Sequence, residues 1–325
     1  MDWRTRLLLC VTLVAACRTG QNYPGIVEPR YAGSAVPTNR PASDTLRIVS
    51  FNVKYAERVD SAIVVLTSEP ALRDADVLLL QEMDAAGTRR IAQALGMSYV
   101  YYPAIFRHRS AKDFGNAVLS RWPIMADSKI VLPHVSRYAR TQRTATAATI
   151  RVGNTDLRVY STHLGTPADI SAAARQAQLR TIIADAAPHS RVIIGGDMNS
   201  ATVGSIATEL GFGWPTQQVE ATNRFGSWDH IFVKGLAVPE SGFAGTIESV
   251  RAASDHKPVW ALAVVRNGRV VPSNRRRITR PPTTNTMIPV MTTIVQKASV
   301  GPPAKACNAG MRVAVSATVA ASNPR

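Results

Sequence analysis

The feature that most limits how this chain can fold is a series of short apolar runs between residues 46 and 265. Each run is rich in β-branched, aromatic or other apolar side chains and is bounded by polar or turn-forming residues, which is typical of strands. The predicted strands are Leu46–Phe51, Val77–Gln81, Tyr99–Tyr102, Asn116–Ser120, Ala145–Val152, Leu157–Thr162, Val192–Gly195, Trp228–Val233 and Val259–Val265. Helical stretches alternate with them at Val59–Leu66, Gly87–Leu95, Ile170–Ala187 and Val203–Leu210. This alternation indicates a sheet-rich α/β layer architecture.

Polar side chains that can bind metals or move protons lie repeatedly at the ends of these runs. They are Asn52, Glu82, His163, Asp197, Asn199, Asp229, Asp255 and His256. Hydrolysis of a phosphoester at neutral pH needs a cation to neutralise the phosphate and a group that activates water. Mg²⁺ prefers carboxylate and amide oxygens. Each residue alone is more often a cap, a turn residue or a buried structural side chain, but the set together favours phosphoester chemistry.

The order of these pieces resembles the endonuclease/exonuclease/phosphatase (DNase I-like) superfamily. The resemblance covers about residues 45–265, and its motifs include Gly195-Gly196-Asp197-Met198-Asn199 and Ser254-Asp255-His256. It implies a four-layer α/β sandwich, in which two packed mixed β-sheets are flanked by helices and the site lies at one edge.

The resemblance also implies a metal site. Glu82 is similar to the principal Mg²⁺ ligand of the family, with Asn52 beside it. Asp255 is similar to a metal ligand or to a residue that supports one. We therefore expect Mg²⁺ as the cofactor, with Mn²⁺ as a substitute, and one or two metal ions both fit the pattern.

The same resemblance assigns catalytic roles. His256 is expected to be the general base, oriented by Asp229, although Asp197 is an alternative acceptor of the proton. Asp197 and Asn199 are expected to position water and phosphate, and His163 resembles a second imidazole that faces the phosphate. The family's DNase I branch orients that imidazole with a Glu near residues 98–106, where this chain has no acidic residue.

Weaker matches suggest residues that bind substrate. Arg143 resembles an arginine that reaches the phosphate, and Asn116 lies in a segment similar to the family's central strand, as a substrate-binding or structural residue. Tyr101 or Tyr102 is a candidate to present a phenol to the phosphate, whereas His230 is expected to be structural.

The ends of the chain predict its location. Residues 1–17 combine two arginines with an apolar run that ends in Val14-Ala15-Ala16-Cys17, similar to a bacterial lipoprotein signal peptide in which Cys17 is lipidated. Residues 18–43 are rich in proline without hydrophobic period and predict a flexible tether. Residues 267–325 predict a basic, low-complexity, disordered tail. The catalytic domain would then span residues 44–266, anchored to the cell envelope outside the cytoplasm.

The charge of residues 44–265 bears on the substrate. Of the formal net charge of +16, most lies in the tail, so this region is almost neutral and does not favour a uniformly basic nucleic-acid-binding domain. We therefore predict a monomeric phosphodiesterase or phosphatase that acts on a phospholipid head group or small phosphodiester. An extracytoplasmic nuclease acting on nucleic acid is the alternative, and a non-catalytic anion-binding lipoprotein is a further one.

Overall fold

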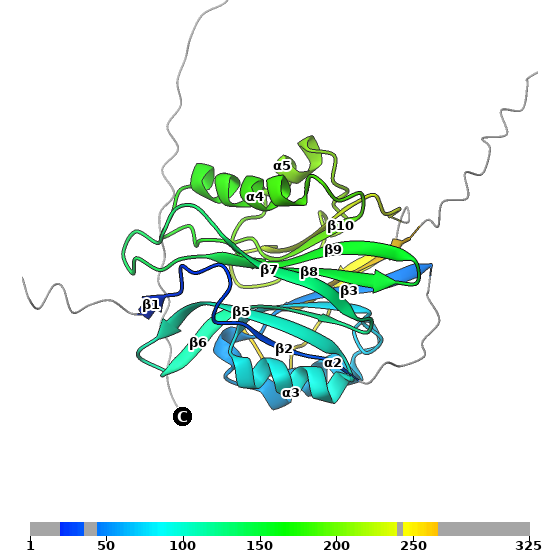
Figure 1. Cartoon of the computed structure of the whole chain (residues 1–325), viewed down its shortest axis with the longest axis horizontal. Coiled ribbons are helices and arrows are strands. Elements are labelled where there is room, and N and C mark those ends of the chain that lie inside the picture. The colour runs from blue at the N-terminus through cyan, green and yellow to red at the C-terminus, as the bar shows by residue number, and fades with distance from the viewer. Residues whose placement is uncertain (1–19, 36–43, 239–242, 266–325) are drawn as a thin grey trace, which may run out of the picture. The chain divides into compact units, whose positions relative to one another are not determined.

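The computed structural model describes residues 20–35, 44–238 and 243–265 (Figure 1). The predictions for the leader, for Cys17 and for the tail after residue 266 lie outside these residues. Among the described residues, no helix is both long and apolar enough to cross a bilayer.

The first sheet is mixed and has eight strands. They are β1 (Gly20–Asn22), β2 (Tyr31–Gly33), β3 (Thr45–Asn52), β4 (Val77–Met83), β5 (Ser98–Arg107), β6 (Lys112–Ser120), β12 (Ala244–Thr246) and β13 (Val259–Val264). Their order is β1-β5-β6-β4-β3-β13-β12, and β2 also pairs with β5. Strands β3 and β4 are parallel, and the other pairs are antiparallel.

The second sheet has five strands in the order β11-β10-β9-β8-β7. They are β7 (Ile124–Val131), β8 (Thr144–Val152), β9 (Thr155–His163), β10 (Val192–Asp197) and β11 (Asp229–Lys234). Strands β9 and β10 are parallel, and helix α4 (Ala172–Ala186) lies between them in the sequence. The carboxyl ends of β9 and β10 therefore meet at one edge of this sheet.

Helices cover the outer faces of both sheets. Helices α2 (Val59–Ser68) and α3 (Ala85–Leu95) bury their apolar side chains against the first sheet, whereas α4 and α5 (Gly204–Glu209) bury theirs against the second. A third apolar layer fills the space between the sheets. Figure 1 shows the resulting order of helices, sheet, sheet and helices, so the predicted four-layer α/β sandwich is confirmed.

The prediction of a flexible tether over residues 18–43 is wrong for residues 20–35, which we call the N-terminal strap. Strands β1 and β2 both pair with β5 at the edge of the first sheet. The guanidinium of Arg30 also bonds both carboxylate oxygens of Asp127 on β7, each at 2.7 Å. Backbone bonds to an edge strand hold the strap in place. It therefore needs no hydrophobic period, and the sequence pattern alone does not reveal it.

Candidate active site

The two sheets bring the predicted polar residues together at one edge of the sandwich. Strands β3 and β4 run parallel; β3 ends there with Asn52, and β4 with Glu82 and Met83. Strand β10 of the other sheet ends there with Asp197. The Asn52 amide donates to Glu82 Oε1 at 3.2 Å and to Asp197 Oδ2 at 3.1 Å. Asn52 therefore ties the two carboxylates, and with them the two sheets, to one point.

A backbone distortion aims Glu82 at this point. The register of β4 against β6 shifts between Leu80 and Met83, and Glu82 has a φ of 59°, which a non-glycine residue adopts only at a cost. Its Oε2 accepts the Tyr55 backbone N–H at 3.1 Å. Burial raises the pKa of Glu82, and the hydrogen bond from Asn52 offsets this only in part. The side chain is thus a buried acid that lacks enough positive charge around it.

A glycine sets the geometry of the second sheet at the same edge. Gly196 has a φ of 153°, and a Cβ there would lie 1.8 Å from the Thr162 carbonyl oxygen, so only glycine fits between β9 and β10. The next position along β10 places Asp197 directly opposite His163 on β9 and Asp229 on β11. Three predicted residues therefore become neighbours through strand register alone.

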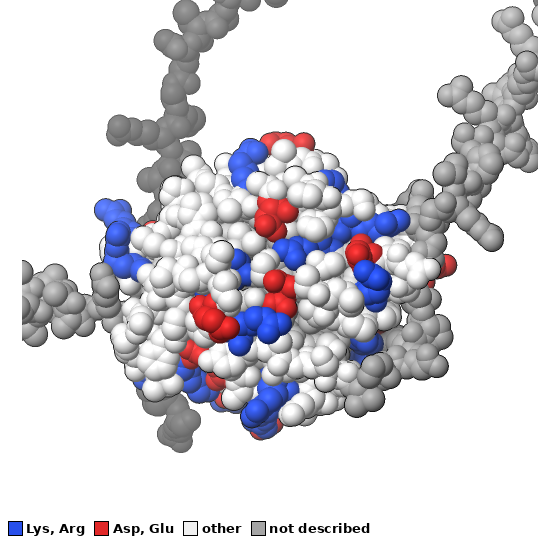
Figure 2. Space-filling model, in the orientation of Figure 1, with Lys and Arg blue, Asp and Glu red and all other residues white. Residues whose placement is uncertain are grey.

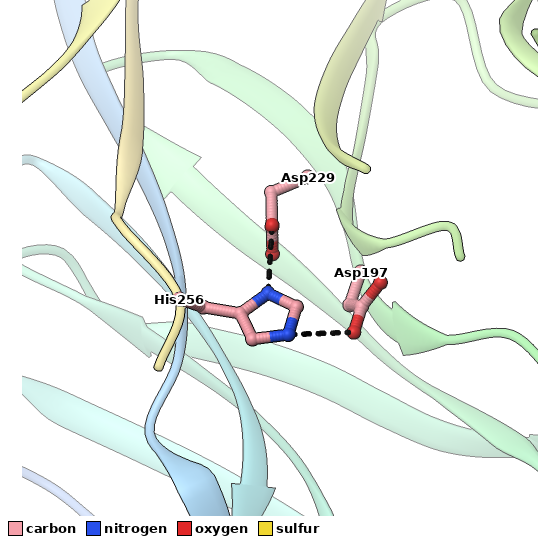
Figure 3. Close-up of side chains that lie close together, drawn as sticks. All are labelled: Asp197, Asp229 and His256. Atoms are coloured by element: carbon pink, nitrogen blue, oxygen red, sulfur yellow. Dashed lines mark hydrogen bonds and ion pairs between the residues drawn. The ribbon is translucent and has the colours of Figure 1, made fainter. Parts of the chain in front are cut away.

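His256 and Asp229 form a hydrogen-bonded pair (Figure 3). His256 Nδ1 lies 2.8 Å from Asp229 Oδ2, which also accepts the Thr222 hydroxyl at 2.6 Å. The other ring nitrogen, Nε2, faces Asp197 Oδ2 at 3.7 Å. Burial alone would lower the pKa of His256, but the bond to Asp229 and the nearby carboxylates raise it to about 10. The imidazole is therefore protonated at neutral pH when these acids are uncompensated.

Asp197 is the buried acid at the centre of the set. Burial, together with the charge of Asp229, raises the pKa of Asp197 to about 7. Its Oδ1 accepts the Asn199 backbone N–H at 2.9 Å, and the Asn199 side-chain amide donates to the Leu164 carbonyl at 2.9 Å. Asn199, whose φ is 49°, thus holds the loop that carries Asp197.

His163 is a neutral imidazole inside the site. Burial lowers the pKa of His163 well below its usual value, and the charges of Arg143 and His256 lower it further. Its Nε2 lies 3.4 Å from Asp197 Oδ2. Its Nδ1 is buried without a hydrogen bond, 3.7 Å from Glu82 Oε1. The acids that face this histidine are therefore Glu82 on β4 and Asp197 on β10, not a residue from 98–106.

Arg143 points a buried guanidinium into the same place. Its Nη1 has no hydrogen-bond partner, and its Cζ lies 5.7 Å from the centre of the Phe114 ring. Burial lowers the pKa of Arg143, while the carboxylates of Glu82 and Asp197 favour its charged form. A donor with no partner beside two acids is suited to a phosphate oxygen.

These groups open into a pocket of about 830 Å³. Its lining combines the predicted acids and imidazoles with aromatic and cationic side chains, namely Lys54, Tyr55, Glu82, Phe114, Arg143, His163, Thr166, Pro167, Ala168, Asp197, Asn199, Asn223, Arg224, Phe225, Trp228, Asp255 and His256. Asp255 lies at its mouth, largely exposed, with Lys54 Nζ 3.6 Å from its carboxylate.

Three side chains that the sequence analysis considered for substrate binding lie outside the pocket. Asn116 donates to the Thr144 carbonyl at 2.8 Å, so its side chain links the two sheets behind Arg143 rather than lining the pocket. The Tyr101 hydroxyl donates to the Met83 carbonyl, and the Tyr102 hydroxyl donates to Asp127. Strand residues alternate between faces, and which face meets the site depends on pairing that the sequence does not display.

His230, by contrast, packs its ring 4.9 Å from that of Trp214, in keeping with the structural role expected for it.

Several pocket residues carry no sequence signal of their own. Tyr55 reaches the site because Lys54, Tyr55 and Ala56 all have positive φ, which turns the chain sharply after β3. Phe225 and Trp228 stack with ring centres 5.1 Å apart. Only their place between the motif residues could have indicated these side chains.

The residues present fit a divalent cation. The Glu82 and Asp197 carboxylates, only 12% and 2% exposed, are separated by one amide, and uncompensated charge this far from water is costly unless a cation joins it. The Asn52 amide oxygen accepts the Lys54 backbone N–H, so a ligand role for Asn52 requires its amide to turn over. Asp197, Asp229 and His256 also cluster within 4.8 Å, but the last two already bond each other.

Comparisons with known proteins agree with this arrangement. A family described as "Endonuclease/Exonuclease/phosphatase family" matches residues 49–256. The structure resembles an endonuclease/exonuclease/phosphatase from Beutenbergia cavernae, at 19% identity and a TM-score of 0.54 over 68% of this chain and 71% of that one. It also resembles D. rerio TDP2 complexed with a single-strand DNA product, at 18% identity and a TM-score of 0.54 over 68% and 99%.

None of the curated proteins compared matches this chain. The family match covers more than half of the sequence, and it includes every catalytic and metal-binding residue predicted above. The chain therefore belongs to the endonuclease/exonuclease/phosphatase family and is a phosphoester hydrolase.

Proposed function

We propose that the protein is a Mg²⁺- or Mn²⁺-dependent phosphodiesterase or phosphatase that acts outside the cytoplasm, anchored through Cys17. One observation carries the catalytic part of the proposal. Two buried acids, a His–Asp pair and an arginine without a partner converge on a single pocket. The proposed anchor rests on the leader sequence alone.

A divalent cation held by Glu82 would neutralise part of the phosphate charge and ease attack by water. The chain's own residues then bind and orient the phosphoester. Arg143 Nη1 and His163 Nδ1, both buried without partners, are placed to donate to phosphate oxygens. The group attached to the phosphate would then pack against the aromatic side chains of the pocket lining, such as Tyr55, Phe225 and Trp228.

The electrostatics of the site favour Asp197 as the acceptor of the water proton. Burial raises the pKa of Asp197 toward neutrality, which suits a general base, whereas the bond to Asp229 raises the pKa of His256 and favours an imidazolium. Asp229 keeps Nδ1 of His256 protonated, so Nε2 can donate a proton or stabilise charge on the phosphate. Of the two acceptors that the family resemblance leaves open, we therefore propose Asp197.

A nuclease is the second candidate. The stacked Phe225 and Trp228 rings offer a surface on which a nucleobase could stack. Against it, residues 44–265 are almost neutral overall, and Figure 2 shows basic and acidic side chains intermixed on the face in view.

The deciding experiment measures metal binding and turnover separately. Thermal unfolding of the full chain, the Glu82→Gln variant and the His256→Ala variant is followed with EDTA, Mg²⁺ or Mn²⁺. We expect the metal to raise the Tm of the parent and of His256→Ala but not of Glu82→Gln, since binding to the native state alone stabilises it.

Turnover of bis-p-nitrophenyl phosphate, p-nitrophenyl phosphate, plasmid DNA and phospholipid head groups is then compared. Metal-dependent turnover lost in both variants supports the proposal. Equal stabilisation of Glu82→Gln by metal would contradict the assignment of Glu82, and preference for plasmid DNA would favour the nuclease.

A further inference from the structure

The described chain begins at the catalytic edge of the domain. Gly20 pairs with Arg107, the last residue of β5, and β5 turns back into β6 through residues 107–112. This hairpin projects from the edge that carries Glu82, since Met83 pairs with Gly115 of β6. The Arg107 guanidinium also lies 3.9 Å from the centre of the Tyr55 ring, which lines the pocket. Figure 1 shows β1 next to β5, with β6 on the other side of β5.

The proposed anchor would therefore lie close to the site. Only two residues separate Cys17 from Gly20, and three residue steps span at most about 10 Å even when fully extended. This step rests on the lipidated Cys17 of the proposed function. With the strap paired to β5, no long tether is left to move the domain away from the bilayer.

The surface around this point combines exposed cations with exposed aromatic rings. We call it the catalytic rim and define it as the hairpin 107–112, the loop 134–140 and the loop 223–225. Its exposed cations are Arg109, Lys112, Arg137, Arg140 and Arg224.

Tyr138 and Phe225 of the rim are 72% and 60% exposed. The loop 134–140 is tied to β1, because the Asn22 amide donates to the Arg140 carbonyl at 2.9 Å. The loop 223–225 belongs to the pocket wall. All three segments thus border either the start of the strap or the pocket mouth.

We infer that the catalytic rim lies against a membrane surface with anionic head groups, and that the substrate is a phosphoester of that surface. Arginines attract anionic lipids, and tyrosine and phenylalanine rings settle at the boundary between water and lipid. A pocket that opens at the same edge would then receive a head group without the lipid leaving the bilayer. An anchored domain with its site at the far end could not do this.

The first test measures binding of the full chain carrying Cys17→Ala, so that no lipid contributes. Vesicles of phosphatidylcholine are compared with vesicles that contain about 30% phosphatidylglycerol, where each surface cation adds to the affinity. The rim variant Arg109→Glu/Arg137→Glu/Arg140→Glu is matched by Arg73→Glu/Arg151→Glu/Arg180→Glu, which has the same net charge. Because the basic tail is present in both, its contribution cancels.

We expect the rim variant to lose at least about tenfold in affinity for the anionic vesicles relative to the matched variant. An equal loss in both would mean that net charge alone binds the vesicles, and would overturn the inference. A rim variant that lost affinity for single-stranded DNA but not for vesicles would show that the rim serves nucleic acid instead.

The second test moves the anchor. A flexible 20-residue Gly/Ser insert between Thr19 and Gly20 of the lipidated chain allows the domain to drift roughly 25 Å from the bilayer. The same insert between residues 266 and 267 is the control. We expect the first insert to slow turnover of vesicle phosphoesters several-fold relative to bis-p-nitrophenyl phosphate, and the second to leave that ratio unchanged.

Equal ratios for the two inserts would overturn the inference. If the parent chain does not turn over bis-p-nitrophenyl phosphate at all, the proposed function is wrong. Failure of the proposed function can therefore be distinguished from failure of this inference.

Discussion

At the residue scale, the site is built from acids whose charged forms are destabilised by burial. Glu82 and Asp197 both have raised pKa values because the sandwich removes them from water. Such buried acids lower the stability of the fold. They are useful in catalysis because a carboxylate with a pKa near neutrality can both lose and regain a proton. Arg143 and His256 supply only part of the compensating charge, which leaves room for a cation.

The cost of Asp197 predicts how the metal-free protein responds to pH. Its pKa is about 7 in the fold and about 3.9 in an unfolded chain, so between these values the folded state holds a proton that the unfolded state has lost. Stability should therefore fall as pH rises from about 4 to 7. Asp197→Asn should abolish turnover yet raise the Tm at pH 8, by roughly 2–4 °C per kcal/mol relieved.

Thermal unfolding in EDTA at pH 5 and pH 8 checks this prediction. Asp156→Asn is the control, because Asp156 is an exposed partner of Arg151 outside the pocket, and it should not gain stability at pH 8. An Asp197→Asn protein that unfolded at a lower temperature than the parent at pH 8 would show that the buried charge is already compensated by the protein.

At the element scale, Asp84 both caps the N-terminus of α3 and contacts Lys112 of the β5–β6 hairpin beside the site. Asp84 Oδ1 accepts the Gly87 backbone N–H at the helix N-terminus, and Lys112 Nζ lies 3.0 Å from its other oxygen. Asp84→Ala should lower the free energy of unfolding by about 1–2 kcal/mol through the lost cap. Urea denaturation measures it, and Lys112→Ala should cost less than half as much, because the Lys112 side chain is half exposed and leaves the cap itself intact. Equal losses would mean that the ion pair, not the cap, is what matters.

The elements also show what the sequence could and could not predict. Every predicted strand and helix exists, because each places a run of apolar side chains in one of the three buried layers. Strand β7 is missing from the sequence prediction because Asp127, Ser128 and Lys129 follow one another in its middle, so Ile124–Val131 shows no alternation of apolar and polar residues. Strands β1, β2 and β12 have three residues each, too few for any period to appear.

The same contrast holds for the site. Residues that end buried strands could be predicted, since parallel strands deliver their ends to one edge. Thr222 and Tyr55 could not, because Thr222 reaches Asp229 through a loop and Tyr55 reaches Glu82 through a left-handed turn. The direction of the Glu82 side chain depends on a bulge in β4, and the apolar pattern of the β4 sequence does not indicate this bulge.

At the scale of the whole molecule, the N-terminal strap is bonded through β1 to the loop that carries Arg143. Asn22 bonds this loop twice, through the Arg140 carbonyl at 2.9 Å and the Gln142 backbone N–H at 2.8 Å. Asn22→Ala should lower the free energy of unfolding by about 1–2 kcal/mol. It should also raise the KM for a phosphodiester more than it lowers kcat, since Arg143 would be held less firmly.

Steady-state kinetics and urea denaturation measure the two effects. Gln21→Ala is the matched control, because Gln21 is the exposed neighbour of Asn22 on β1 and should change neither quantity. A KM that stayed at the parental value in Asn22→Ala would separate the strap from substrate binding and leave it a purely structural role.

The strap also imposes an order on how the protein matures. Gly20 is made long before its partner Arg107, 87 positions later, and a contact this distant in sequence closes only after the intervening chain is present. Until β5 is made, residues Gly20–Asn22 have no strand to pair with. If Cys17 is lipidated as proposed, the modifying enzyme would act three positions before a strand that is unpaired while β5 is still missing and paired once β5 is in place.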